Sequence, residues 1–507
     1  MVIILFELSP RMIFFEFVVV RKFYRNNIFF ALVFVSTLFS PHLYAQDTSF
    51  VPNWVKDAIV YQIFPERFAN GDSTNDPPNV EQWNGEPTFR NYFGGDIQGI
   101  IDHLDYVRQL GANTIYLTPI FESPTNHKYQ TTDYYAIDPH FGTEKLFQQF
   151  IDSCHARHLR VILDAVFNHT GRDFFAFKDI LKNQERSKYV HWYTIHNFPV
   201  SNSDPPNYEA FWGESSLPKL NTDNPEVRKY LFDVTTYWTS KGIDGWRLDV
   251  ADGPSHDFWI QWRKVVKKIN PNIYISGEIW DDASAWLHGD QFDGVMNYRF
   301  RGACVGFFAL DNRNAKQFDS ILEDVDRHCP PDVSYGLMNL IGSHDTERFL
   351  TLCDGDVDKL KLAVLFQMTY LGIPTIYYGD EIGMLGGRDP GCRHTMIWDT
   401  TKWNSNLQAW YRTMISVRNK YGVFRRGSVQ TIIADSAKDL YAFMRRDSVT
   451  QAVVIINNST DHRQLTAGDI LPENKWFDLT DGKDFPQDGV IDLSPRSGMV
   501  LISSKGK

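Results

Sequence analysis

The chain has 507 residues, of which 43% are hydrophobic and 22% are charged. This is ordinary globular composition, and it excludes a wholly disordered chain, a collagen and a coiled coil. A net charge of -11 makes nucleic acid an unsuitable partner. The five cysteines are too few for a disulfide framework, their odd number leaves at least one thiol free, and none forms the CxxC pair of a zinc ribbon.

Residues 1–45 predict a secretory signal peptide. Arg21–Arg25 is basic, Ile28–Phe39 is a nearly unbroken apolar run, and Ala45 supplies a small residue for cleavage. The apolar run is shorter than a membrane span requires, although an uncleaved N-terminal anchor is the alternative interpretation. We therefore expect a periplasmic or extracellular protein without a membrane span after processing. Residues 1–20 precede this pattern, which suggests that the natural start lies nearer residue 20.

Eight short β-rich runs recur between residues 55 and 380, and many are separated by helical patterns. They are Ala58–Ile63, Thr114–Leu117, Val161–Asp164, Gly245–Asp249, Ile273–Glu278, Gly294–Asn297, Leu337–Gly342 and Thr375–Tyr378. This alternation predicts an α/β fold, a (β/α)8 TIM barrel. A doubly wound open sheet is the competing fold, but no glycine-rich dinucleotide loop follows the first strand.

Two segments depart from the alternation. Residues 170–222 are rich in Asn, Pro and aromatic residues and follow the third strand, so we expect an inserted subdomain there. Residues 419–507 contain strand patterns without helices, which predicts a C-terminal antiparallel β-sandwich domain. Residues 46–169 and 223–418 then form the barrel. Its clearest helix is predicted after Ser255, with Phe258, Trp262, Val265 and Ile269 on one face.

Carboxylates stand where four of the predicted barrel strands end. Asp164 ends the third strand, Asp249 the fourth and Glu278 the fifth, while Asp345 follows the seventh. Barrel proteins place their chemistry at the C-terminal ends of strands. A buried carboxylate is costly unless it is paired or used. Each acid alone is as readily a helix cap or an ion-pair partner, but four together indicate an active site.

Two carboxylates facing one sugar bond are the minimum for glycoside hydrolysis. Arg247 shares a strand face with Asp249, so its guanidinium is expected to keep Asp249 ionised as a nucleophile, which leaves Glu278 as the acid with a raised pKa. His169 and His344 are expected to donate hydrogen bonds to sugar hydroxyls. Some of these side chains are also metal-ligand types, but their spacing matches no zinc signature.

With these motifs the sequence resembles the α-amylase family of glycoside hydrolases, family 13, over nearly all of residues 53–505. Asp164–His169, Gly245–Asp249, Gly277–Trp280 and Leu340–Asp345 match its four main segments in order. The resemblance implies that Asp249 is the nucleophile, Glu278 the general acid/base and Asp345 the transition-state stabiliser. The substrate-binding residues that it implies are His127, Tyr129, Asp164, His169, Arg247, Trp280, His344 and Arg393. For Tyr129, expected to stack on the sugar being cleaved, a core tyrosine remains the alternative.

Leu217–Asn221 and Tyr61–Phe68 are similar to segments of the neopullulanase, cyclomaltodextrinase and maltogenic amylase branch, and Trp280 beside the acid fits it too. That branch usually has an extra N-terminal β-domain that supports dimers. The predicted barrel begins within about ten residues of the expected cleavage site, so we expect this chain to lack that domain, to be a monomer and to have a more open cleft.

The resemblance also implies a calcium site. Asn70, Asp72, Asn75 and Asp76 offer oxygen ligands within one loop, and Gly94 and Asp96 follow nearby in sequence. Carboxylate, amide and backbone oxygens suit Ca²⁺. The spacing is not that of an EF-hand, and by itself the loop would more often be a polar turn. The resemblance assigns all six residues as ligands, with Ca²⁺ as the cofactor.

These observations predict a secreted, retaining α-glucan hydrolase that cleaves α-1,4 bonds of starch and maltooligosaccharides, with pullulan or cyclodextrins as further substrates. A transglycosylase or glucan isomerase using the same residues is the nearest alternative. A glucan-binding protein with an inactive site is the alternative from another class. The retention of Asp249, Glu278, Asp345 and Arg247 argues against it.

Overall fold

The structure, a computed structural model, describes residues 50–201, 203–472, 475–486 and 489–504. The predicted signal peptide at residues 1–45 lies outside the described residues. Within them, no helix combines the length and the apolar character needed to cross a membrane. All five cysteines lie inside these ranges, and none of them forms a disulfide.

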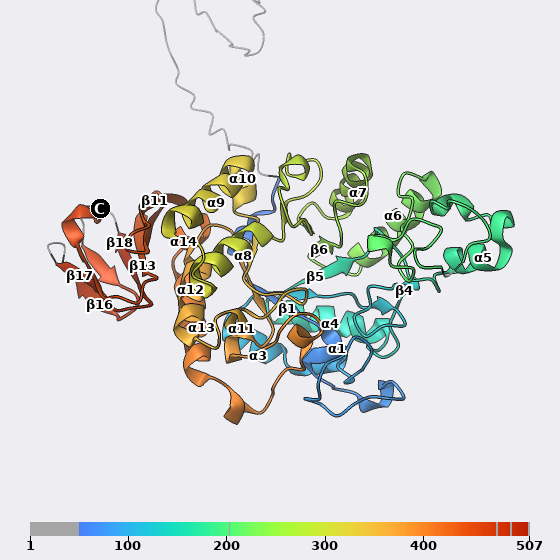
Figure 1. Ribbon diagram of the computed structural model, residues 1–507, viewed down its shortest axis with the longest axis horizontal. Helices are drawn as coiled ribbons and strands as arrows, with labels where there is room; N and C mark the ends of the chain where they lie inside the picture. The colour runs from blue at the N-terminus through green and yellow to red at the C-terminus, as the bar shows by residue number, and fades with distance from the viewer. Residues whose placement is uncertain (1–49, 202, 473–474, 487–488, 505–507) are drawn as a thin grey trace, which may run out of the picture. The chain divides into compact units, whose positions relative to one another are not determined.

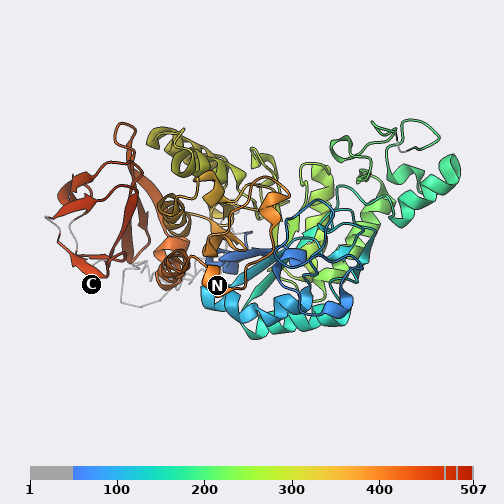
Figure 2. The ribbon, with the colours of Figure 1, turned by 60° about the horizontal axis from the view of Figure 1, so that its bottom comes forward.

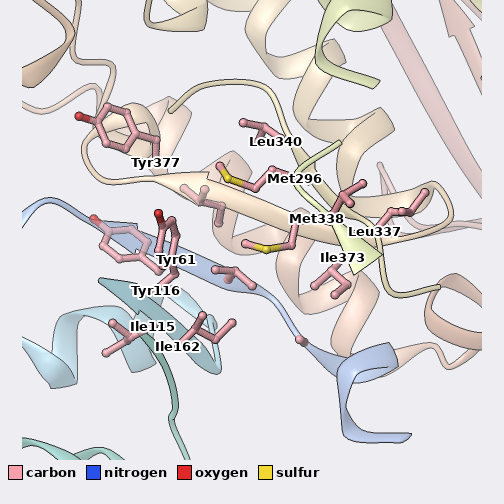
Figure 3. Packing of buried hydrophobic residues seen from close by; sticks show 14 of the residues in the cluster. Tyr61, Ile115, Tyr116, Ile162, Met296, Leu337, Met338, Leu340, Ile373 and Tyr377 are labelled. Atoms are coloured by element: carbon pink, nitrogen blue, oxygen red, sulfur yellow. The ribbon is translucent and has the colours of Figure 1, made fainter. Parts of the chain in front are cut away.

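Eight parallel strands build the predicted barrel within the described residues, in the order β8-β7-β6-β5-β2-β1-β10-β9. A parallel bridge between Met296 and Met338 joins the two ends of this order, and both side chains lie in the packed interior (Figure 3). The strands are fully or almost fully buried, which explains their continuous apolar runs. They are β1 Val60–Ile63, β2 Thr114–Leu117, β5 Arg160–Ala165, β6 Gly245–Leu248, β7 Tyr274–Gly277, β8 Gly294–Val295, β9 Met338–Leu340 and β10 Ile373–Tyr377.

Helices connect and surround these strands (Figure 1). Those before β6 are α1 Pro65–Phe68, α2 Ile97–Asp102, α3 Leu104–Leu110, α4 Glu144–Ala156, α5 Phe175–Asn183 and α6 Pro225–Thr239. Those after it are α7 His256–Ile269, α8 Tyr298–Cys304, α9 Ala315–His328, α10 Pro331–Ser334, α11 Phe349–Leu352, α12 Val357–Thr369, α13 Ser405–Lys420 and α14 Val423–Arg426.

Helix α7 confirms the predicted cap, because the Ser255 side chain accepts a hydrogen bond from the backbone N–H of Phe258. The predicted buried face was partly wrong. Phe258 and Trp262 are buried, but Val265 is only half-buried and Ile269 is exposed. The buried face instead continues through Val266, and the last apolar residue of the helix, Ile269, lies outside it.

The segment after β5 contains α5 and several short turns, and backbone bridges hold it together. His169 pairs with Lys219, Tyr193 with Leu220, Ile195 with Tyr208 and Ala210 with Pro218. A second inserted segment, the two-stranded sheet of β3 Phe121–Glu122 and β4 Asp133–Ile137, follows β2. Both inserted segments follow the C-terminal ends of barrel strands, so they border any site that these strand ends form.

The C-terminal strands form antiparallel sheets, as predicted, but the first strand begins only at Ser428, after the end of α13 and the short helix α14. Within the described residues, one sheet has the order β11-β12-β13-β18-β15-β16 and the other pairs β14 with β17. They are β11 Ser428–Asp435, β12 Leu440–Arg446, β13 Thr450–Asn457, β14 Arg463–Thr466, β15 Trp476–Asp478, β16 Lys483–Phe485, β17 Val490–Leu493 and β18 Ser497–Ser504. In Figure 2 these red strands lie beside the orange helices, on the opposite side of the barrel from the green segment with α5.

Candidate active site

One buried arginine joins three carboxylates at the ends of neighbouring strands. From β6, Arg247 places Nη1 2.9 Å from both carboxylate oxygens of Asp164 and 2.8 Å from Oδ1 of Asp249. Its Nη2 lies 2.9 Å from Oε2 of Glu278. Strands β5, β6 and β7 pair in that order, so their carboxyl ends meet. We call Arg247 with Asp164, Asp249 and Glu278 the arginine cluster.

Burial dominates the electrostatics of this cluster. It raises the pKa of Asp249 well above the usual range, the pKa of Asp164 to about 6, and the pKa of Glu278, while Arg247 opposes each rise. One guanidinium cannot neutralise three carboxylates, so full ionisation would leave two uncompensated charges in a buried site. Arg247 lowers the pKa of Asp249, as expected, but it shares its one charge among three acids, so the protonation of Asp249 also depends on the proton that the cluster holds.

Glu278 is held from two sides. Its Oε2 accepts a 3.0 Å hydrogen bond from the backbone N–H of Val250, and its Oε1 accepts one of 3.3 Å from the indole of Trp280. Val250 adopts a φ of 45°, a conformation that β-branched residues rarely occupy. Such strain persists only where the surroundings impose it, and it is concentrated at functional sites. Trp280 in turn stacks on Tyr298, with ring centroids 3.7 Å apart.

Asp345 lies near the cluster but with a different environment. Its Oδ1 is 3.3 Å from Nη2 of Arg393, and its Oδ2 is 3.3 Å from Nε2 of His344. The side chain is 25% exposed, compared with 7% for Asp249, so a ligand has better access to it. Arg393 is also paired with Asp389 at 3.1 Å.

A short chain of hydrogen bonds orients Tyr129 and His344. The Tyr129 hydroxyl lies 2.6 Å from Nε2 of His344 and donates to Oδ2 of Asp164 at 3.1 Å. The two rings are parallel, with centroids 5.5 Å apart. Nδ1 of His127 accepts from the backbone N–H of Tyr129 at 3.1 Å, which fixes the loop carrying the tyrosine.

The three histidines of the site are neutral near pH 7. Burial lowers the pKa of His169 to about 4 and that of His127 to about 3, and it lowers the pKa of His344 well below the usual value. The backbone of Tyr129 opposes the shift at His169, which links this histidine to the same loop. Neutral imidazoles offer one donor and one acceptor each, as recognition of hydroxyl groups requires.

The structure thus gathers the eleven residues predicted as catalytic or substrate-binding around the strand ends. Sequence reasoning missed several neighbours, among them Gln62, Tyr116, Phe211, Tyr298 and Asp389; the Tyr116 hydroxyl donates to Oδ2 of Asp164 at 2.7 Å. Gln62 donates to Nδ1 of His344 at 2.8 Å from β1. Phe211 stacks on His169. Gln62 could have been noticed as a polar residue inside an otherwise apolar strand. Asp389 could have been noticed because it stands four residues before Arg393, with which it pairs.

The six predicted calcium ligands also lie together. Nδ2 of Asn70 donates to Oδ1 of Asp76 at 2.8 Å, and a side chain at Gly94, where φ is 82°, would collide with both. Asp96 accepts from the backbone N–H of Asp72 at 2.8 Å and from Nδ2 of Asn75 at 3.3 Å.

The chemistry of this loop fits a cation. Oδ1 of Asn75 is buried and accepts no hydrogen bond, and burial raises the pKa of Asp96 and of Asp76. A hard cation would satisfy the Asn75 oxygen, whereas both carboxylate oxygens of Asp96 already accept hydrogen bonds from backbone N–H groups. Within the described residues no three His, Cys, Asp or Glu side chains converge as metal ligands. The candidate site therefore depends on amide and backbone oxygens in addition to its aspartates.

Comparisons with known proteins agree with this geometry. Residues 62–421 match the family described as alpha amylase, catalytic domain. Neopullulanase 2 of Thermoactinomyces vulgaris is 47% identical over 92% of this chain and 80% of that protein. A cyclomaltodextrinase of Thermoanaerobacter pseudethanolicus is 47% identical over 91% of this chain and 80% of that protein. Among solved structures, the cyclic alpha-maltosyl-(1→6)-maltose hydrolase of Arthrobacter globiformis has a TM-score of 0.84 and 40% identity, covering 90% of this chain and all of that one.

Proposed function

The chain belongs to the α-amylase family of glycoside hydrolases, in its neopullulanase, cyclomaltodextrinase and maltogenic amylase branch, and we propose that it hydrolyses α-1,4-glucosidic bonds with retention of configuration. Its proposed substrates are starch and maltooligosaccharides, with pullulan and cyclodextrins as further candidates. The observation that carries the proposal is the arginine cluster beside Asp345, because it places a protonatable carboxyl and a second carboxylate in one buried site.

In the proposed mechanism, Glu278 gives its proton to the glycosidic oxygen while Asp249 attacks the anomeric carbon. The bond to the leaving sugar breaks and a β-linked glycosyl-enzyme forms. Glu278, now ionised, removes a proton from water, which attacks the same carbon and releases Asp249, so the product keeps the α configuration. This mechanism requires one protonated and one ionised carboxyl. The raised pKa values in the arginine cluster support it, because they favour a proton on one of the three acids.

The remaining residues have binding and positioning roles in this proposal. Asp345 and Arg393 hold hydroxyls of the sugar at the cleavage point, and Tyr129 stacks on that sugar. His127, His169 and His344 donate or accept hydrogen bonds as neutral imidazoles. Asp164 positions Arg247 and Tyr129, since it bonds to both. Trp280, with 48% of its surface exposed beside the acid, offers a ring to the leaving sugar.

We also propose that residues Asn70, Asp72, Asn75, Asp76, Gly94 and Asp96 bind Ca²⁺. The buried, unpaired oxygen of Asn75 and the raised pKa of Asp96 support the proposal. The loop follows β1 and also borders α2, whose N-terminus is capped by Asp96. A cation there would contribute to stability by fixing this loop to the barrel and would take no part in bond cleavage.

Export and a monomeric state complete the proposal. The order of basic, apolar and small residues before Ala45 supports export to the periplasm or the exterior. One relative, from Bacillus subtilis, is named an intracellular maltogenic amylase, so membership of the branch does not decide the compartment. Fractionation of the producing cells with N-terminal sequencing tests export. An intact N-terminus in the cytosol contradicts it. Light scattering of the purified chain tests the monomer, and a dimer contradicts it.

The experiment that tests the activity compares products from soluble starch, pullulan and a cyclodextrin by chromatography. Maltose and longer oligomers from starch support the proposal. Panose from pullulan together with cyclodextrin opening adds neopullulanase-type specificity. Transfer products that dominate even at low sugar concentration would instead support the transglycosylase. Absence of cleavage of all three would overturn the proposed function.

A further inference from the structure

Trp212 is the most exposed large hydrophobic side chain in the part of the chain that the structure describes. Its exposed fraction is 92%, compared with 63% for Phe89 and 48% for Trp280. A tryptophan in water contributes nothing to the hydrophobic core, and the free energy that its burial would provide is not gained. A single exposed hydrophobic residue is ordinary on a protein surface, so the case for a function of Trp212 depends on its backbone, its neighbours and its connection to the active site.

The backbone at Trp212 is held in a defined turn. Trp212 has φ 50° and ψ 23°, the left-handed region that a residue with a side chain adopts only under local constraint. Two hydrogen bonds close the turn around it: Gly213 N–H donates to Ala210 at 3.1 Å, and Glu214 N–H donates to Phe211 at 2.9 Å. The space around Gly213 is open, so nothing packs over the turn there.

The turn is anchored to the active site itself. Phe211 N–H donates to the carbonyl of Leu217 at 3.0 Å, and Ala210 pairs with Pro218. The next residue, Lys219, pairs with His169, which lies four residues after the end of β5. Trp212 is therefore connected to His169 through a short, hydrogen-bonded ribbon. Its distance from the site is set by the fold and does not depend on a free loop.

Three stacked rings lead outward from the site. His169 stacks on Phe211 with centroids 5.1 Å apart and an interplanar angle of 13°. Phe211 stacks on Trp212 with centroids 4.9 Å apart and an angle of 18°. The innermost ring is buried, and the outermost is almost fully exposed. The three stacked rings therefore extend from the buried His169 of the active site to the solvent-exposed Trp212.

We propose that Trp212 is an outer sugar-binding platform for α-glucan chains. The faces of pyranose rings are apolar and stack on flat aromatic surfaces, while their hydroxyls stay in water. A half-exposed or exposed indole suits such a ligand, because it offers a large rigid area without burying a charge. The inference deepens the proposed function and rests on it, since it concerns the same substrate class at a position outside the cleavage point.

The platform has a specific consequence for substrate length. A short substrate that fills only the positions next to Asp249 and Glu278 does not reach the outermost ring. A longer glucan reaches it and gains one stacking contact. Trp212 therefore favours long substrates over short ones, and its removal should affect them unequally while the chemical step stays unchanged.

The test compares Trp212→Ala, Trp212→Phe and wild type on maltoheptaose and maltotriose. A stacking contact of about 0.5–1.5 kcal/mol corresponds to roughly a two- to tenfold change. Trp212→Ala should lower kcat/KM for maltoheptaose by about this factor, mainly through KM, and leave maltotriose within about twofold. Trp212→Phe should restore most of the loss. Phe477→Ala, in the C-terminal sheet, is the control for losing an exposed ring elsewhere.

Binding is measured separately in an Asp249→Asn background by calorimetry, so that the readout does not depend on turnover. Weaker binding of maltoheptaose, but not of maltotriose, after Trp212→Ala supports the platform. Equal losses for both sugars, or none, overturn it. A change of oligomeric state on removal of Trp212, with length-independent activity, would identify the ring as a self-association contact instead. If the wild type cleaves no glucan at all, the proposed function is wrong. If it cleaves glucans but Trp212→Ala shows no dependence on chain length, only the sugar-binding role of Trp212 is wrong.

Discussion

Gln62 on β1 donates a 2.8 Å hydrogen bond to Nδ1 of His344, which lies 282 residues further along the chain. This bond makes Nδ1 the acceptor, so the proton of the neutral imidazole is on Nε2, 2.6 Å from the Tyr129 hydroxyl and 3.3 Å from Asp345. The Tyr129 hydroxyl in turn donates to Asp164. A buried amide thus sets the hydrogen-bond direction through three residues of the site.

The first prediction follows from this relationship. Gln62→Leu removes the donor to Nδ1, so His344 loses its fixed tautomer and orientation. We expect kcat to fall by roughly ten- to a hundredfold, because small displacements of positioned groups have effects of this size, while KM changes little. Steady-state kinetics test the split, and Gln62→Glu tests donor character, since a carboxylate accepts where the amide donates. Unchanged kcat in a folded Gln62→Leu variant contradicts the assignment.

The second prediction separates the two catalytic carboxyls. Glu278→Gln should lower kcat on starch by about 100- to 10,000-fold, the usual range for loss of a general acid/base. The loss should be smaller for glycosylation by α-maltosyl fluoride, because fluoride leaves without a proton. Azide should then restore turnover and give α-maltosyl azide, identified by NMR.

The matched control is Asp249→Asn, which lacks the nucleophile and should form no α-azide. Circular dichroism should show both variants folded, since Arg247 keeps two of its three carboxylate partners in each. A β-configured azide from Glu278→Gln would reverse the roles of the two residues. Activity of Asp249→Asn within tenfold of wild type would exclude Asp249 as the nucleophile.

The third prediction concerns calcium. Chelation should lower the melting temperature, and added Ca²⁺ should restore it, with a stabilisation of about 2.7 kcal/mol at a hundred times Kd. Asn75→Ala removes the unpaired buried oxygen together with the hydrogen bond from Nδ2 to Asp96, so it should melt no higher than the chelated wild type and should not respond to added Ca²⁺.

Gln98→Ala is the control for this loop, because Gln98 is half-buried on α2 and its side chain donates to Asp102. It should keep the full response to Ca²⁺. Calorimetric titration with Ca²⁺ alone measures the same site without reference to activity. Identical titrations of wild type and Asn75→Ala would show that the loop is not the calcium site.

The fourth prediction uses Glu381, a buried carboxyl outside the proposed mechanism. It accepts hydrogen bonds from the hydroxyls of Tyr61 and Tyr106, and burial raises its pKa from 4.5 to about 7. The folded state therefore favours the protonated form. Its contribution to stability is complete below pH 4.5 and is lost as the pH rises through 7. At one pKa unit per 1.36 kcal/mol, the loss is about 3 kcal/mol.

Glu381→Gln removes the ionisation while keeping an oxygen acceptor for both tyrosines. We expect the variant to be more stable than wild type at pH 8 and similar at pH 4.5. Urea unfolding at the two pH values measures the difference. A constant difference between the two proteins at both pH values would mean that Glu381 does not titrate in this range.

Much of the fold could be predicted because its signals are local. Buried parallel strands are continuous apolar runs, so all eight barrel strands were found with small errors at their ends. Strands β11, β14 and β16 of the C-terminal sheets give a weak sequence pattern, because most of their residues are half-buried or exposed. The buried face of α7 differs from the predicted one. Periodicity shows which apolar residues share a side of the helix, but the neighbouring elements decide which of them are buried.

The sequence by itself determined which side chains stand at the strand ends: Asp164, Asp249, Glu278 and Asp345 each follow or close a buried run. Tertiary structure alone decided how they share charge and how far the site extends. Arg247 contacts three acids because β5, β6 and β7 are adjacent, and Gln62 reaches His344 because the barrel closes β1 against β10 and β9. Local propensity and periodicity act over a few residues, but contacts between strand ends depend on the closure of the whole sheet.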